Sequence, residues 1–221
     1  NVVEAADYSS AAYTFASDIT VNGLTVGKGA NAVASNTVLG VNALDAAVTG
    51  INNVAVGANA LTTNTSGQSN TAVGSSALYV NTTGTNNVAI GINAGASNTT
   101  GGVNVFIGRN AADANTTGEN NTAIGNESLG ANTTGVNNVA VGASSLLSNT
   151  TASFNTAVGD KAMQTNTTGT NNSAYGHQAL NKNTTGGLNT ALGLNALYSN
   201  TTGGTNTAVG HTSLYANTTA S

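Results

Sequence analysis

The sequence predicts an all-β chain that folds as a parallel β-solenoid, or β-roll, of about eleven coils. Glycine follows an apolar residue every 17 residues, without insertion or deletion. Such a unit is too short for the helix pair of a helical solenoid, which needs about 33 residues or more. Only 5% of the residues are charged and 4% aromatic, whereas 39% are apolar and regularly placed. This composition argues against both a compact enzyme and a disordered chain.

The recurring glycine defines column 1 of the repeat, and the columns are numbered 1 to 17 from it. The consensus unit is G-x-x-A-L-x-x-N-T-T-G-x-N-N-T-A-V. Column 1 is occupied by Gly40, Gly57, Gly74, Gly91, Gly108, Gly125, Gly142, Gly159, Gly176, Gly193 and Gly210. Residues 36–221 therefore form one repeat domain. Residues 1–35 lack the period and form a non-repeat cap, with strands expected around 8–15 and 19–26.

Each unit contains two stretches that alternate as strands do. Columns 14–17, Asn-Thr-Ala-Val, predict one strand, and Ala-Leu in columns 4 and 5 predicts a second short strand. The Asn-Thr-Thr-Gly segment between them predicts a turn. Because Asn and Gly tolerate the left-handed backbone region, we expect the corners of the coil at columns 1, 8 and 11.

Asparagine fills two columns almost without exception, and stacking places successive members about 4.8 Å apart. Stacked Asn side chains can hydrogen-bond along such a ladder. Column 8 is Asn from Asn64 to Asn217. The ladder in column 14 includes Asn70, Asn87, Asn104, Asn121, Asn138, Asn155, Asn172, Asn189 and Asn206.

The predicted strand is apolar on both of its faces. Column 16 is nearly always Ala and column 17 is mostly Val or Ile, and adjacent strand residues point to opposite sides. A strand that is apolar on both faces is usually buried on both, so a second layer must come from another part of the coil or from another chain, and we expect a neighbouring chain. One irregular unit has Gly95 in the Leu column and Phe106 in the Ala column. This exchange of volume predicts that columns 5 and 16 line the same space.

The Asn-Thr-Ala-Val-Gly-x-x-Ala-Leu core, as in Asn70–Leu78 and, with Ser213 in place of Ala, in Asn206–Leu214, resembles repeats in two families of surface proteins. These are the heads of trimeric autotransporter adhesins and phage tail-fibre or tailspike proteins. The lead-in 19–27 also looks like the segment that introduces such repeats in tail fibres. The resemblance covers about residues 19–221. It implies a left-handed, homotrimeric β-roll displayed outside the cell, on a virion tail or a bacterial surface.

No catalytic, cofactor-binding or metal-ligating set is expected, because the acids are too sparse to pair. Asp45 and Asp113 share column 6 but lie four coils apart. Asp160 and His177 share column 2 in adjacent coils and can form a surface contact, and His211 lies two coils further on. Eight acids against four bases give a net charge of −4, so we expect no nucleic-acid partner. No run of 18 apolar residues predicts membrane insertion.

Exposed aromatic residues are the candidate contacts for a receptor or glycan. Tyr79, Tyr198 and Tyr215 share column 6, and the last two are neighbours in adjacent coils, where ladder stacking is the alternative explanation. Ten Asn-Thr-Thr or Asn-Thr-Ser triplets match the N-glycosylation acceptor but coincide with the predicted turn.

The function expected from these features is a structural or adhesive segment of an extracellular fibre, and not an enzyme. A rigid shaft displays weak contacts repeatedly, so that they sum to avidity. The partners expected are further copies of the chain, as a homotrimer or filament, and a host surface glycan or protein. Two alternatives stay open: a self-assembling extracellular filament, and an ice-binding solenoid that uses the Thr ladders of columns 9 and 10. A polysaccharide-degrading tailspike would need acids from a neighbouring subunit.

Overall fold

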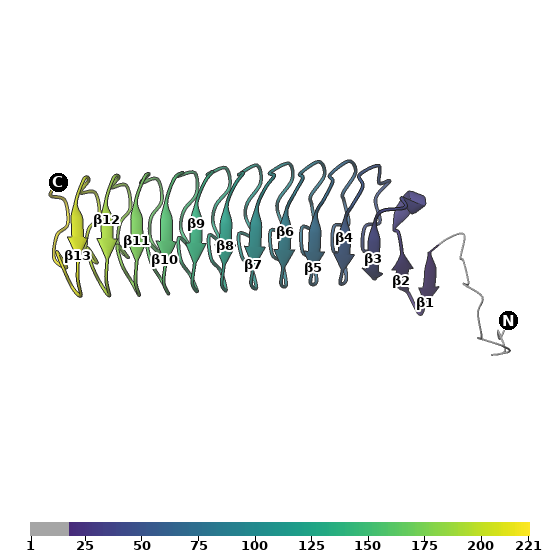
Figure 1. The fold of residues 1–221 in the computed structure, drawn as a ribbon, viewed down its shortest axis with the longest axis horizontal. Helices are drawn as coiled ribbons and strands as arrows, with labels where there is room; N and C mark the ends of the chain where they lie inside the picture. Colours follow the sequence, from purple (N-terminus) through teal and green to yellow (C-terminus); the bar gives the residue numbers. More distant parts are fainter. Residues whose placement is uncertain (1–17) are drawn as a thin grey trace.

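The computed structural model describes residues 18–221, which form a parallel β-solenoid with one strand in each coil (Figure 1). The strands follow one another in chain order within a single 13-stranded sheet. They are β1 (Ile19–Val21), β2 (Leu24–Gly27), β3 (Thr37–Gly40), β4 (Val54–Val56), β5 (Thr71–Val73), β6 (Val88–Ile90), β7 (Val105–Ile107), β8 (Thr122–Ile124), β9 (Val139–Val141), β10 (Thr156–Val158), β11 (Ser173–Tyr175), β12 (Thr190–Leu192) and β13 (Thr207–Val209). The 3-10 helix η1 (Ala30–Ala32) lies between β2 and β3.

The lead-in to the repeats is a hairpin that runs against the direction of the solenoid. β1 pairs antiparallel with β2 across an Asn22-Gly23 turn, and β2 pairs antiparallel with β3. The Asp18 carboxylate accepts hydrogen bonds from the backbone N–H groups of Lys28 and Gly29, at 2.6 and 2.7 Å. The strand expected within 19–26 is thus two strands, whereas the strand expected at 8–15 lies outside the described residues.

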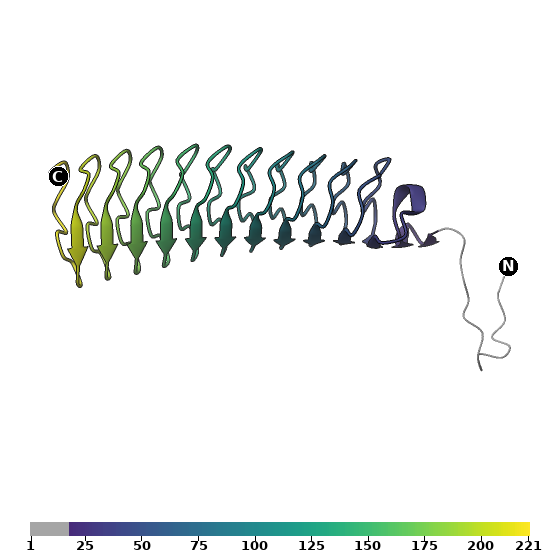
Figure 2. The ribbon, with the colours of Figure 1, turned by 45° about the horizontal axis from the view of Figure 1, so that its top comes forward.

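From β3 to β13 all neighbouring strands are parallel and in strict register. Thr122 of β8 lies opposite Val139 of β9, and the same shift of one repeat holds for every pair. Figure 2 shows the strands along one side of the rod and the connecting loops on the other. The register follows from the sequence, because each column meets its own copy in the next coil.

The second strand predicted at columns 4 and 5 is wrong. Residues there form turns, because columns 3 and 5 both adopt the left-handed region. In one coil Glu127 has φ 56° and Leu129 has φ 54°. Two left-handed residues separated by one position cannot lie in an extended strand. The Leu side chain still points inward, because Leu129 is fully buried.

The chain bends at columns 9 and 10, between the predicted corners, but columns 8 and 11 do not adopt the left-handed region that was expected there, whereas column 1 does. Positive φ occurs at columns 1, 3, 5 and 13. Column 11 favours glycine because successive coils approach closely there: a Cβ on Gly118 would lie 2.5 Å from the carbonyl oxygen of Gly135. Alanine nevertheless occupies the column at Ala152 and Ala220. Column 8 requires asparagine for its amide, which is buried in the interior of the coil.

The interior is built from small and medium apolar side chains of columns 4, 5 and 16. Ala123 and Ala140 of column 16 are fully buried, as is Leu146 of column 5. In the irregular coil, a Cβ on Gly95 would lie 2.5 Å from Cδ2 of Phe106, and Phe106 is itself fully buried. The prediction that columns 5 and 16 line one space is therefore confirmed.

Both asparagine ladders form inside the coils. In column 14, Oδ1 of Asn104 accepts from the backbone N–H of Asn121 at 2.9 Å, and Nδ2 of Asn121 donates to the Gly135 carbonyl at 2.8 Å. In column 8, Nδ2 of Asn115 donates to Oδ1 of Asn98 at 2.8 Å. Buried amides that are satisfied in this way hold successive coils in a single register.

Candidate functional site

The outward surface of the parallel strands is the largest uniform surface of the rod, and we call it the outer face of the sheet. It consists of columns 15 and 17 of β3–β13, because the alanine of column 16 between them points inward. Column 15 contributes Thr37, Val54, Thr71, Val88, Val105, Thr122, Val139, Thr156, Ser173, Thr190 and Thr207. Column 17 contributes Leu39, Val56, Val73, Ile90, Ile107, Ile124, Val141, Val158, Tyr175, Leu192 and Val209.

No charged residue occurs on the outer face of the sheet. Its apolar side chains remain partly accessible: Ile124 is 37% exposed, Leu192 48% and Val209, in the last strand, 64%, whereas side chains such as Val73 and Ile107 are half-buried. The sequence predicted that the strand is apolar on both faces, and the two faces now have different surroundings. The alanine face is covered by the coil itself, whereas the described chain leaves the Val and Ile side chains partly open.

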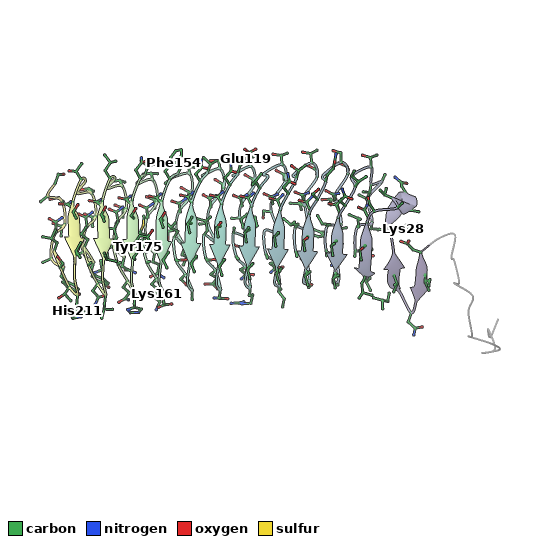
Figure 3. All side chains as sticks on the ribbon, in the orientation of Figure 1. Lys28, Glu119, Phe154, Lys161, Tyr175 and His211 are labelled. Carbon is green, nitrogen blue, oxygen red and sulfur yellow. The ribbon has the colours of Figure 1, made fainter. Side chains whose placement is uncertain are left out.

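The edge formed by columns 2 and 3 carries half of the Asp, Glu, Lys and Arg residues of the repeats and both histidines (Figure 3, where Lys161 and His211 mark it). Arg109 and Glu127 form an ion pair at 3.2 Å. Asp160 and His177 lie 3.3 Å apart, as their shared column predicted. All four side chains are at least one-third exposed, so each pair contributes about 0–1 kcal/mol. This edge is a solvated surface with weak ionic contacts.

Nothing in the described chain brings acids or histidines together as a reactive or ligating cluster. No three His, Asp or Glu residues lie close enough to share a metal ion within residues 18–221. Burial raises the pKa of Asp113, and the negative charge of Glu127 also raises it, while backbone hydrogen bonds act in the opposite direction. Asp45, in the same column, lies four coils away. No helix among the described residues is long and apolar enough to cross a membrane.

The tyrosines of column 6 are separated into a pair and a single residue. The rings of Tyr198 and Tyr215 stack with centroids 5.1 Å apart and planes within 3°. Nζ of Lys182 lies 5.1 Å from the centroid of the Tyr198 ring. Tyr79 lies seven coils from this pair. The faces of the Tyr198 ring are thus occupied by its neighbours, so a sugar would reach that ring only at its edge.

The two threonine columns point in different directions. Column 9 hydroxyls donate to the backbone of the next coil, as Thr116 does to the carbonyl of Thr133 at 2.9 Å. Column 10 side chains such as Thr117 are exposed, which leaves a single open rank of threonine on this surface. The column 8 asparagines of the glycosylation triplets are different, because their side chains are buried and hydrogen-bonded from Asn64 to Asn200.

The opposite edge, at columns 12 and 13, carries apolar side chains that the sequence analysis did not single out. Val103, Phe154 and Leu188 occupy column 13, where five other coils have Asn. They are 55%, 57% and 63% exposed, and Figure 3 labels Phe154 at this edge. The replacement of a repeated Asn by a large apolar residue is a signal that a column-by-column comparison of the sequence could have found.

No protein-family model, curated protein or solved structure matches the chain. The similarity to adhesin heads and tail fibres therefore depends on the repeat motifs alone.

Proposed function

We propose that this chain is a rigid shaft segment of an extracellular fibre, in which several copies pack lengthwise through the outer face of the sheet. A homotrimer is the assembly that the repeat resemblance favours. Such a shaft would stand on a virion tail or a bacterial surface, where its exposed edges could contact a host glycan or protein. The observation that carries the proposal is the outer face itself, which is uncharged and rich in Val, Ile and Thr along all the parallel strands.

The dimensions of the outer face favour packing between parallel rods. Eleven strands, β3–β13, at about 4.8 Å each give a length of about 50 Å. Columns 15 and 17 are about 7 Å apart, so the strip between them covers roughly 350 Å². Column 15 is largely Thr, so the apolar part of the strip is no larger than the largest apolar patch on a typical soluble monomer, and such a patch is often functional. A long, narrow strip with identical contacts in every coil suits a neighbour that runs in the same direction.

The chemistry of the strip supports burial against a similar surface. When Val and Ile side chains are buried in an interface, removing their apolar surface from water stabilises the assembly by about 25 cal/mol per Å². The columns contain no charge whose burial would oppose association. The ladders beneath keep the strip straight and in register, so little conformational entropy remains to be lost when copies associate.

Light scattering on the purified chain tests this proposal with two matched variants. The parent should have a mass that is a multiple of 21.4 kDa. Ile107→Glu places a charge in the middle of the outer face and should reduce the mass to that of one chain. Thr117→Glu adds the same charge to column 10, which lies elsewhere on the coil, and should leave the assembly intact. A parent that is monomeric at micromolar concentration would refute the proposal.

Ice binding is the second candidate, and the outer face is a better location for it than columns 9 and 10. Column 15 places the methyl and hydroxyl groups of Thr71, Thr122 and Thr156 on a flat surface, and these hydroxyls make no hydrogen bond within the described chain. Ice binding requires this surface to be open in solution, whereas a shaft requires it to be covered. Thermal hysteresis from a monomeric chain, lost in Thr122→Tyr, would favour ice binding over the fibre.

A further inference from the structure

The edge at columns 12 and 13 contains three large apolar residues in an unfavourable backbone conformation. Val103, Phe154 and Leu188 have φ of 59°, 61° and 61°. Asn accepts the left-handed region more readily than other side chains, and five coils have Asn at this column. For a β-branched residue such as Val103 this conformation is strained. The local backbone therefore favours Asn at all three positions.

The three side chains also contribute nothing to the interior of the coil. Each is more than half exposed, whereas the neighbouring column 14 asparagines, such as Asn104 and Asn155, are fully buried. The backbone beneath them is firmly held, because the N–H of Phe154 donates to the carbonyl of Val136 at 3.1 Å and that of Leu188 to Thr170 at 3.0 Å. A strained, exposed apolar residue on a rigid support indicates a role outside the coil.

We propose that this edge is a lipid-contacting edge, and that Val103, Phe154 and Leu188 insert into the hydrocarbon boundary of a bilayer while the rod lies along its surface. This inference is independent of the proposed shaft function, because it concerns columns 12 and 13, whereas the shaft packs through columns 15 and 17. The absence of a run of 18 apolar residues led us to expect no membrane insertion, and the proposed contact differs from that expectation. Three residues that lie 51 and 34 positions apart leave no apolar window in the sequence.

The spacing of the three side chains favours a bilayer over a protein partner. They lie three and two coils apart, which is about 14 and about 10 Å. Asn120, Asn137 and Asn171 occupy the coils in between. A protein interface needs a contiguous apolar core, which these isolated side chains do not form. A fluid bilayer accepts separate apolar side chains one at a time.

The charge of the edge indicates which lipids it would contact. Glu119 is the one charged residue in columns 12 and 13 of the described repeats, and no basic residue accompanies it. The edge therefore lacks the Lys and Arg residues that attract anionic lipids. We expect contact with zwitterionic membranes that depends little on salt.

The strength of the contact can be compared with that of a lipid anchor. The three side chains together hold about as many carbon atoms as one myristoyl chain, which binds membranes with a constant on the order of 10⁴ M⁻¹. We therefore expect one chain to bind membranes weakly and reversibly, with a binding constant no higher than that of the myristoyl chain. Several copies in one fibre would strengthen it by avidity.

Flotation of the intact chain with phosphatidylcholine vesicles tests the proposal. The triple variant Val103→Asn/Phe154→Asn/Leu188→Asn should lose binding and also melt at a higher temperature, because Asn fits the backbone at column 13. The control Ile92→Asn/Leu194→Asn removes exposed apolar residues from column 2 and should keep the binding of the parent. Ile92 and Leu194 are 53% and 41% exposed.

Several results would overturn the proposal. They are a parent chain that does not float with the vesicles, a triple variant that binds as the parent does, and binding that requires anionic lipid and disappears in salt. A lower melting temperature of the triple variant would also refute the premise, since it would give these residues a stabilising role in the fold.

Discussion

Phe106→Ala should be among the most destabilising single substitutions in this rod. Phe106 is fully buried, and its ring occupies the space that Leu fills in regular coils. A buried Phe removes roughly 200 Å² from water, which at about 25 cal/mol per Å² is about 5 kcal/mol. Substitutions of this kind cost about 3–5 kcal/mol, because the cavity collapses only in part. Urea denaturation followed by circular dichroism gives the free energy of unfolding.

The substitution Gly95→Leu provides a second test of the space that columns 5 and 16 share. Gly95→Leu alone should destabilise the chain, because its side chain would overlap the Phe106 ring. The double variant Gly95→Leu/Phe106→Ala restores the Leu and Ala of the consensus, and the φ of Gly95, 58°, is close to the 54° of Leu129 in the same column. It should recover most of the lost stability. A loss below about 1 kcal/mol for Phe106→Ala, or additive losses in the double variant, would refute the shared space of columns 5 and 16.

Three further predictions concern the ladders and one acid. Asn121→Ala should lower the free energy of unfolding, measured in urea, by about 3 kcal/mol, because it leaves buried groups of the next coil without hydrogen-bond partners. The control Asn120→Gly changes an exposed residue and should be nearly neutral. Equal losses in the two variants would contradict the role of the ladder. Gly108→Ala should lower the melting temperature far more than Gly210→Ala, because both have positive φ but only the first would place a Cβ 2.5 Å from a carbonyl oxygen; equal shifts would contradict this. Since the pKa of Asp113 is raised above 3.8, its charge opposes folding at neutral pH. Asp113→Asn should therefore raise the melting temperature at pH 7 and not below pH 3.8, and a gain at both pH values would be inconsistent with this cause.

The period of the sequence predicted the architecture because stacking requires the same residue type in each column. Asn121 and its equivalents were predicted to form a ladder on this ground, and they do. Phe106 and Gly95 were predicted to share a space, because a gain and a loss of volume in one unit are visible without coordinates. These are properties of single columns, or of a pair of columns in one coil.

The backbone path between the ladders could not be predicted in the same way. Leu129 adopts a left-handed φ of 54°, which its residue type does not favour, so a strand was predicted where the chain turns. The bonding within the stack imposes this conformation, since the N–H of Leu129 donates to the carbonyl of Ser145 in the next coil. Asn115 was assigned to a corner for its tolerance of positive φ, yet its amide serves the buried ladder.

The recognition surfaces were only partly predictable. The tyrosine pair Tyr198 and Tyr215 follows from a shared column, and the rings do stack. The edge with Phe154 was missed, because its significance depends on the backbone angle and exposure of column 13, which the repeat pattern does not contain.

The rate at which a single thiol reacts with a polymer-linked maleimide tests most directly whether the outer face of the sheet is covered by other copies. The chain has no cysteine, so Thr122→Cys and Thr117→Cys each introduce one thiol. If other copies cover the outer face of the sheet, the thiol at position 122 should react about tenfold more slowly than that at position 117, corresponding to about 1.4 kcal/mol of protection. Adding Ile107→Glu should remove the difference. Equal rates at the two positions in the parent assembly would contradict the account.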